Sequence, residues 1–179
     1  MDRLGSESDL VALYDTHARL LFHYLSRRVG PEAADDLVAE TFLAAWQQRA
    51  TFDPARAGAK AWLYGIATNL MRRHLRGEER RLRAWGRAWS NWIGHRRSDD
   101  DLGERVATAA DAEVLAGRAA EAVAQLRSEE REVLLLVAWA SLTPTEVAEA
   151  LGVAVATVRT RLHRARTNVR KHLEDSRDV

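Results

Sequence analysis

The chain has 179 residues, of which 46% are hydrophobic and 30% are charged, and its formal net charge is +1 at pH 7. Disorder throughout is excluded, because it requires low hydrophobicity together with a large net charge. The chain has no cysteine, which excludes disulfide bonds, thiolate zinc sites and thiol redox switches and fits a reducing cytoplasm. No signal-peptide pattern opens the sequence, and the longest apolar run, residues 133–140, is too short to cross a bilayer. We therefore expect a cytoplasmic protein without membrane insertion.

Although the net charge is close to zero, the chain contains two basic segments. Residues 72–97 contain nine arginines against two glutamates, and residues 155–171 contain six basic residues and no acidic one. Between them, residues 98–104 contain four acidic residues and no basic one. Basic segments attract phosphate, although many are only solvated helix faces. The charge distribution therefore indicates two candidate nucleic-acid contacts.

The first part of the chain predicts three helices, over residues 8–29, 32–48 and 59 to at least 76. Apolar residues recur there at steps of three and four, which is the spacing of one helix face. Gly30 followed by Pro31 predicts a helix end and then a helix start, and Gly77 predicts a break or kink. The expected buried positions are Leu10, Leu13, Tyr14, His17, Leu20, Leu21, Tyr24 and Leu25, then Leu37, Val38, Phe42, Ala45 and Trp46, then Trp62, Leu63, Ile66, Ala67, Leu70 and Leu75. We expect these helices to form a first small domain, residues 7–82.

Residues 83–110 predict a tryptophan-containing helix followed by a charged linker. Trp85, Trp89 and Trp92 lie on one helical face. They are either a docking surface for a partner or an extra helix that closes the core of the first domain, and we expect burial because soluble monomers avoid exposed apolar patches. Residues 96–103 are polar and charged, which is typical of a flexible linker.

The last part predicts a second small helical domain, residues 111–174, with helices over residues 111–126, 128–140, 143–151 and 155–173. Thr143, Pro144 and Glu146 form a capping-box sequence at a helix start. A second, arginine-rich helix follows the glycine at position 152. The capped helix, the glycine and the arginine-rich helix together predict a helix-turn-helix whose second helix lies in the DNA major groove. The alternative is a solvated basic helix in an ordinary bundle. The fold class we expect is all-α, with two small domains joined by a flexible linker.

Three segments resemble one family. Residues 129–166 resemble region 4 of the extracytoplasmic-function sigma factors of bacterial RNA polymerase, residues 35–46 resemble region 2.2, and residues 61–76 resemble regions 2.3 and 2.4. The segments occur in the family's order. The resemblance implies a transcription initiation factor that binds core RNA polymerase and directs it to promoters by recognition of the −10 and −35 elements.

The resemblance also implies site residues. In the family, region 2.2 binds the β′ coiled coil, region 2.4 binds the melted −10 strand, and region 4 recognises the −35 element and contacts the β flap; an anti-sigma protein is a further expected partner. The matching positions are Asp35, Asp36 and Glu40 for β′; Asn69, Arg72, Arg73, His74 and Arg76 for the −10 element, with Trp62 and Tyr64 nearby; and Thr157, Arg159, Thr160, His163, Arg164 and Arg166 for the −35 element. Of the two nearby aromatics, Trp62 is the one we expect in the core.

Some observations favour plainer interpretations. Asp36 and Glu40 share a helical face, but acidic residues in the early turns of a helix also serve only to solubilise it or to complement its dipole. The chain departs from the family at Ala39, where glutamine is common, at Arg73, where aspartate is common, and at Ser141, where glycine is usual. A left-handed backbone at position 141 would strain a serine.

Catalysis finds no support in the sequence. The six histidines are scattered, and no phosphate-binding glycine loop is present. We therefore expect no enzyme activity, no cofactor and no metal. Two alternatives to a sigma factor remain open. A conventional repressor or activator would dimerise and bind duplex DNA alone, and a helical interaction protein would bind only RNA or protein partners.

Overall fold

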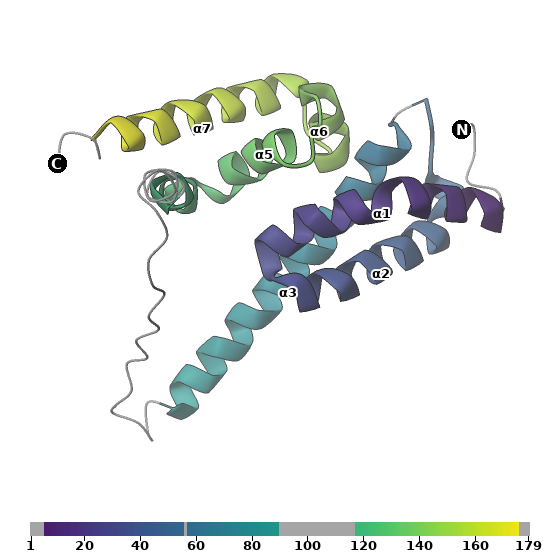
Figure 1. The fold of residues 1–179 in the computed structure, drawn as a ribbon, viewed down its shortest axis with the longest axis horizontal. Coiled ribbons are helices and arrows are strands. Elements are labelled where there is room, and N and C mark those ends of the chain that lie inside the picture. The colour runs from purple at the N-terminus through teal and green to yellow at the C-terminus, as the bar shows by residue number, and fades with distance from the viewer. Residues whose placement is uncertain (1–5, 56, 90–116, 176–179) are drawn as a thin grey trace, which may run out of the picture.

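The computed structural model describes residues 6–55, 57–89 and 117–175, and every α-helix predicted within these residues is present (Figure 1). The elements are α1 (Glu7–Val29), α2 (Pro31–Gln47), the short 3-10 helix η1 (Arg49–Thr51), α3 (Ala59–Trp89), α5 (Ser128–Ala138), α6 (Pro144–Leu151) and α7 (Val155–Asp175). A further helix covers residues 117–125. The described residues contain no strand, which confirms the all-α fold class.

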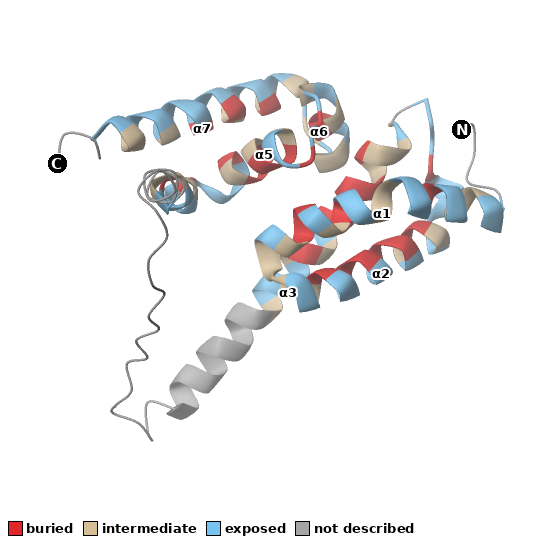
Figure 2. Cartoon of the chain, in the orientation of Figure 1, coloured by how far each residue is buried: buried red, intermediate tan, exposed pale blue. Residues whose placement is uncertain are grey.

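Helices α1, α2 and α3 form the amino-terminal unit. Ser6 caps α1 in a capping box with Asp9. Gly30, with φ of 84°, separates α1 from α2, and Pro31 occupies the first position of α2 as predicted. Figure 2 shows the buried faces of the three helices turned toward one another. Their core includes Leu13, Leu21, Tyr24, Leu25, Leu37, Phe42, Leu63, Tyr64 and Met71.

Several expectations for this unit are wrong. Tyr14 and Leu20 of α1 are 49% and 50% exposed and do not belong to the buried core. Tyr64 is 1% exposed and belongs to the core, whereas Trp62 is only half-buried. Helix α3 continues through Gly77 to Trp89, since one glycine costs a helix only about 1 kcal/mol. The side chains of Trp85 and Trp89, and all of Trp92, lie outside the described residues.

Helices α5, α6 and α7 form the carboxy-terminal unit, in which α5 and α6 both pack against α7. Arg131 of α5 joins this unit to the preceding helix by donating to the carbonyls of Val123, Ala124 and Leu126. Those carbonyls lie at the end of the 117–125 helix, where they have no partner within the helix. Ser128 begins α5 as expected, although no side chain caps this helix.

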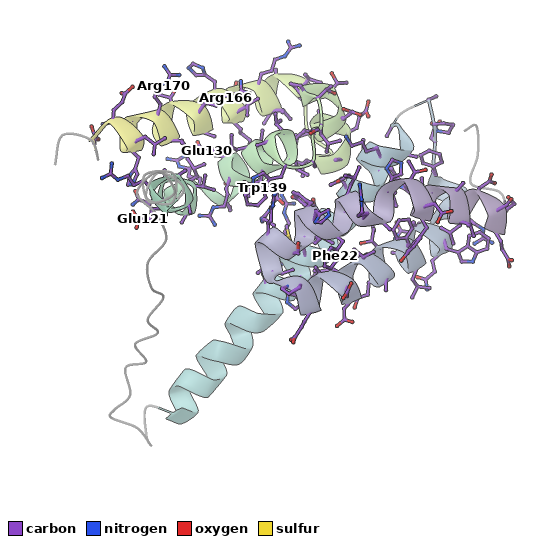
Figure 3. All side chains as sticks on the ribbon, viewed as in Figure 1. Phe22, Glu121, Glu130, Trp139, Arg166 and Arg170 are labelled. Carbon is purple, nitrogen blue, oxygen red and sulfur yellow. The ribbon has the colours of Figure 1, made fainter. Side chains whose placement is uncertain are left out.

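The two units are packed directly against each other through α3 and α6. Buried residues of both units belong to one continuous hydrophobic core. A Cβ atom added at Gly65 of α3 would lie 2.7 Å from the carbonyl oxygen of Ala150 in α6, so the two helices are in backbone contact there. Trp139, directly after α5, lies between the units (Figure 3), with the guanidinium of Arg27 5.5 Å from the centroid of its ring.

Candidate nucleic-acid interface

The helix-turn-helix consists of α6, the turn at residues 152–154 and α7. The Thr143 hydroxyl accepts from the Glu146 backbone N–H at 3.3 Å, and the Glu146 carboxylate accepts from the Thr143 backbone N–H at 2.8 Å. This confirms the predicted capping box, and these hydrogen bonds keep the pKa of Glu146 below its usual value. Gly152 ends α6 in the left-handed conformation, with φ of 65°. The turn therefore has a conformation that suits glycine.

Helix α7 separates a buried face from a basic face. Val158, Leu162 and Ala165 are buried and attach the helix to the rest of the unit. The opposite face exposes Arg159, Thr160, His163, Arg164 and Arg166, while Thr157 is half-buried at the edge. Figure 3 shows Arg166 and Arg170 on the side of α7 turned away from α5. The predicted −35 residues thus gather on one exposed face, as a recognition helix requires.

The −10 candidates of α3 differ in how exposed they are and in whether they are already paired. Asn69, Arg73 and Arg76 are exposed, and His74 is half-buried. Arg72 differs from these residues because its Nε already donates a hydrogen bond to the Glu132 carboxylate of α5 at 2.7 Å. Sequence reasoning missed this ion pair, whose members are 60 residues apart.

Aromatic side chains near these candidates line a groove between the units. Phe52 and Trp62 stack with ring centroids 4.9 Å apart. They border a groove of about 610 Å³ whose other wall includes Ala148, Gly152 and Val155 of the helix-turn-helix. Trp62 lines this groove and is half-buried, so of the two aromatics named as nearby −10 candidates it is the one that remains accessible. Tyr64 is removed from this role by its burial.

The acidic candidates on α2 are all accessible. Asp35, Asp36 and Glu40 are exposed, and Glu40 lies about one turn after the adjacent Asp35 and Asp36. Exposed apolar residues also occur on α1 and α2, and sequence reasoning did not select them for binding: Val11, Tyr14, Leu20 and Leu43 are 49–58% exposed. Tyr14 lines a pocket together with Asp35. An apolar centre with a polar rim is typical of a protein-binding surface.

Metal-binding groups and membrane-spanning helices are two further features of interest in the part of the chain that the structure describes. Residues 6–55, 57–89 and 117–175 contain no group of histidine, aspartate and glutamate side chains that could bind a metal ion. None of the helices searched there is both long and apolar enough to cross a membrane.

Known proteins resemble this chain along most of its length. The Sigma-70 region 2 family matches residues 13–81, and the Sigma-70 region 4 family matches residues 116–169. The ECF RNA polymerase sigma factor SigL of Mycobacterium tuberculosis is 32% identical over 165 residues, which are 92% of this chain and 88% of the relative. The chain belongs to the ECF sigma factors of RNA polymerase.

Further relatives agree with this assignment. CnrH of Cupriavidus metallidurans is 34% identical over 139 residues, which are 75% of this chain and 70% of the relative. The solved structure of CnrH in complex with the cytosolic domain of CnrY has a TM-score of 0.65 and 28% identity, covering 96% of this chain and 91% of that chain. The sigma factor RpoE of Bartonella quintana, solved with the anti-sigma factor NepR, shares the fold at a TM-score of 0.59, 19% identity and coverage of 94% and 96%.

Membership in this family defines the general function. The protein is a transcription initiation factor that directs RNA polymerase to specific promoters. The family consists of regulatory transcription factors rather than catalytic enzymes. The region 2 match covers most of α1, all of α2 and most of α3, and the region 4 match covers α5, α6 and most of α7.

Proposed function

We propose that residues 7–82 bind the polymerase β′ coiled coil and the −10 element, that residues 111–174 recognise the −35 element and contact the β flap, and that residues 83–110 connect these two domains. The observation that carries the proposal is the exposed basic face of α7 behind a capped, glycine-terminated α6. A helix placed in this way enters the major groove and presents its amino-terminal turns to base edges.

The −35 contacts fall into two groups along α7. Arg159, Thr160, His163 and Arg164 lie in the first half of the helix and face solvent, with the half-buried Thr157 at their edge. Arginine donates two hydrogen bonds to guanine O6 and N7, which makes these positions suited to base recognition. Arg166 and Arg170 lie further along, where arginine binds phosphate and orients the helix without specifying sequence.

The −10 contacts lie on α3 and in the loop that precedes it. Single-stranded DNA is bound by basic side chains along its phosphates and by aromatic rings on which bases stack. Arg72, Arg73 and Arg76 supply the charge, with Asn69 and His74 beside them. The half-buried Trp62, whose ring packs on the buried Phe52, supplies the stacking surface.

The polymerase contact lies on α2, with Asp35, Asp36 and Glu40 as the charged residues. Their carboxylates are exposed and would pair with basic residues of the β′ coiled coil, while neighbouring apolar side chains such as Tyr14 and Leu43 would be buried on binding. An anti-sigma protein is a further proposed partner, supported by the structure of CnrH in complex with the cytosolic domain of CnrY.

The proposal is tested by transcription of a genomic library with core RNA polymerase, with and without this protein. We expect a small set of transcripts that require the protein and whose promoters share −10 and −35 sequences. Specific binding of the isolated protein to duplex DNA as a dimer, with no effect on the polymerase, would contradict the proposal. That result would instead indicate a conventional repressor or activator.

A further inference from the structure

Glu132 of α5 is a buried carboxylate approached by two arginines of the amino-terminal unit. Its side chain is 5% exposed; Oε2 accepts from Arg72 Nε at 2.7 Å, and Arg28 Nη1 lies 3.8 Å from Oε1. We call Arg28, Arg72 and Glu132 the interdomain ion cluster. A carboxylate removed from water requires such pairing, because an unpaired buried charge is strongly destabilising.

One member of this cluster is also a proposed −10 contact. The Nε of Arg72 cannot donate the same hydrogen bond to Glu132 and to a DNA phosphate. We propose that Glu132 takes the place of a phosphate between Arg28 and Arg72, so that closure of the two units and binding of single-stranded promoter DNA exclude each other. The inference rests on the proposed −10 role of α3, and it adds Arg28 as a phosphate-binding residue that sequence reasoning did not select.

Arg28 is positioned independently of Glu132. Its Nη1 donates to the Tyr24 hydroxyl at 3.1 Å, and its guanidinium lies 5.8 Å from the centroid of the Tyr24 ring. Burial raises the pKa of Tyr24, so its hydroxyl stays protonated and its oxygen remains a neutral acceptor. Because Tyr24 is part of the core of α1, α2 and α3, Arg28 keeps its place when Glu132 leaves.

The cluster is built so that an anion can displace Glu132. Oε1 has no hydrogen-bond partner, so only one carboxylate oxygen is fully paired. The Arg72 side chain is 37% exposed, so solvent and salt screen its attraction to Glu132. A groove of about 550 Å³ reaches the cluster, and arginines of both units outnumber its two glutamates: Arg28, Arg72, Arg76, Arg131 and Arg161 line it with Glu129 and Glu132. An approaching phosphate is therefore attracted to the ion pair that it replaces.

Opening can be measured by energy transfer between dyes. The chain has no cysteine, so Ala12→Cys in α1 and Thr167→Cys in α7 give two labelling positions, both exposed. The probe is a pool of single-stranded 20-nucleotide DNAs of random sequence. We expect the DNA to lower the transfer efficiency of the full-length protein, and rising salt without DNA to lower it as well. A poly-glutamate peptide is the parallel probe: opening by the peptide and not by DNA would overturn the proposal in favour of an acidic protein ligand.

Two variants open the units by unrelated means. Glu132→Gln removes the charge that pairs with the arginines, while Gly65→Ala introduces the Cβ that collides with the Ala150 carbonyl. Both variants should start with low energy transfer and bind the DNA pool more tightly. The gain is about tenfold if about nine in ten wild-type molecules are closed, since the apparent dissociation constant is the intrinsic one divided by the open fraction. Loss of energy transfer in Gly65→Ala with unchanged DNA affinity would overturn the proposal, even if Glu132→Gln fails to fold.

The role of Arg28 is tested in the open background. Adding Arg28→Ala to Gly65→Ala should weaken DNA binding and reduce the slope of log affinity against log salt by about 0.7, the value for one phosphate contact on a single strand. Arg19→Ala, at an exposed arginine of the same helix, is the matched control and should leave the slope unchanged. Equal slopes for the Arg28 and Arg19 variants would remove Arg28 from the phosphate contacts.

Failure of this inference can be distinguished from failure of the proposed function. Transcription with core polymerase tests the proposed function and does not depend on the closed state. If promoter-specific transcription occurs but the opening variants bind DNA no better than the wild type, the ion cluster is structural only. If DNA opens the protein but no promoter is transcribed, the sigma-factor role of these residues is wrong and the competition at Arg72 stands.

Discussion

Lys60 Nζ, at the start of α3, donates a hydrogen bond to the backbone carbonyl of Ser141 at 3.0 Å, which links the amino-terminal unit to the turn between α5 and α6. Ser141 has φ of 51°, and among the described residues it is the one non-glycine residue with a positive φ. The left-handed conformation brings a serine Cβ close to the carbonyl oxygen, which costs about 1–2 kcal/mol. The interface therefore uses the carbonyl of a strained residue.

Ser141→Gly should relieve that strain. Glycine adopts a positive φ without the Cβ conflict, although it also gains entropy in the unfolded chain. We expect the free energy of unfolding to rise by about 0.5–1 kcal/mol, as measured by urea denaturation. Ser26→Gly, inside α1, is the control and should lower the free energy of unfolding, because glycine is unfavourable in a helix. A loss of stability in Ser141→Gly would show that the serine side chain has a role of its own.

Local signals explain which parts of the fold were predictable. The Thr143–Glu146 capping box and the Gly30–Pro31 boundary depend on neighbouring residues and are present as predicted. The burial of Tyr64 and the pairing of Glu132 depend on residues distant in sequence, and periodicity alone does not identify which helix faces meet. The exposed basic face of α7 was predictable because one helix contains it entirely.

Tyr64 packs edge to face on Tyr24, with ring centroids 5.4 Å apart, at the centre of the amino-terminal core. Tyr64→Ala removes a fully buried ring and leaves a cavity, so we expect a loss of about 3–5 kcal/mol in the free energy of unfolding. Tyr64→Phe keeps the ring and should cost about 1.5 kcal/mol at most. Urea denaturation of both variants checks this. A small effect of Tyr64→Ala would mean that the ring is a surface stacking residue, as its position in the sequence first suggested.

The free energy of unfolding should decrease in two steps as the pH is lowered. The pKa of His17 is lowered from 6.5, first by burial and then by the nearby charge of Lys60, and the pKa of Glu146 is lowered from 4.5 by the Thr143 backbone N–H. In both cases the unfolded chain binds the proton more readily than the folded one, so acidification favours unfolding. The first loss begins as the pH falls through about 6.5, and the second as it falls through about 4.5.

His17→Gln is the variant that separates the two steps. It should flatten the dependence of the unfolding free energy on pH below about 6.5 while leaving the step from Glu146 in place. Glu146→Gln should do the reverse. Urea denaturation at a series of pH values measures both, and a wild-type protein that becomes more stable between neutral pH and pH 5 would contradict the assigned directions.

Asp36→Arg combined with Glu40→Arg should weaken binding to core RNA polymerase and leave the helical content unchanged. Both side chains are exposed, so the reversal does not disturb the core, but it replaces attraction by repulsion at the proposed β′ contact. Affinity for core polymerase and circular dichroism measure the two effects. Glu121→Arg with Glu174→Arg, which changes the net charge equally at exposed positions of the other unit, is the matched control. Wild-type affinity in the Asp36 and Glu40 variant would place the polymerase contact elsewhere.

Arg159→Ala and Arg170→Ala should have different effects on promoter binding by the holoenzyme. Arg159 is exposed near the start of α7, next to the buried Val158 that attaches the helix to its unit, so in the proposed docking its guanidinium would face base edges. Its loss should cost about 1–3 kcal/mol and relax the base preference at one −35 position. Arg170 is exposed about three turns nearer the carboxyl end and faces away from α5 (Figure 3). Its loss should weaken all sequences alike and reduce the salt slope by about one unit.

The measurement is holoenzyme binding to a set of −35 variants at several salt concentrations. His163→Ala extends the series, because His163 lies one turn after Arg159 on the same exposed face and should alter the preference at a neighbouring base pair. Equal weakening of every −35 variant by Arg159→Ala and Arg170→Ala would make Arg159 a phosphate contact. The burial of Val158, Leu162 and Ala165 fixes which face of α7 points outward from its unit. In that case the whole unit would therefore dock on DNA in a different orientation, with Arg159 turned toward the phosphates.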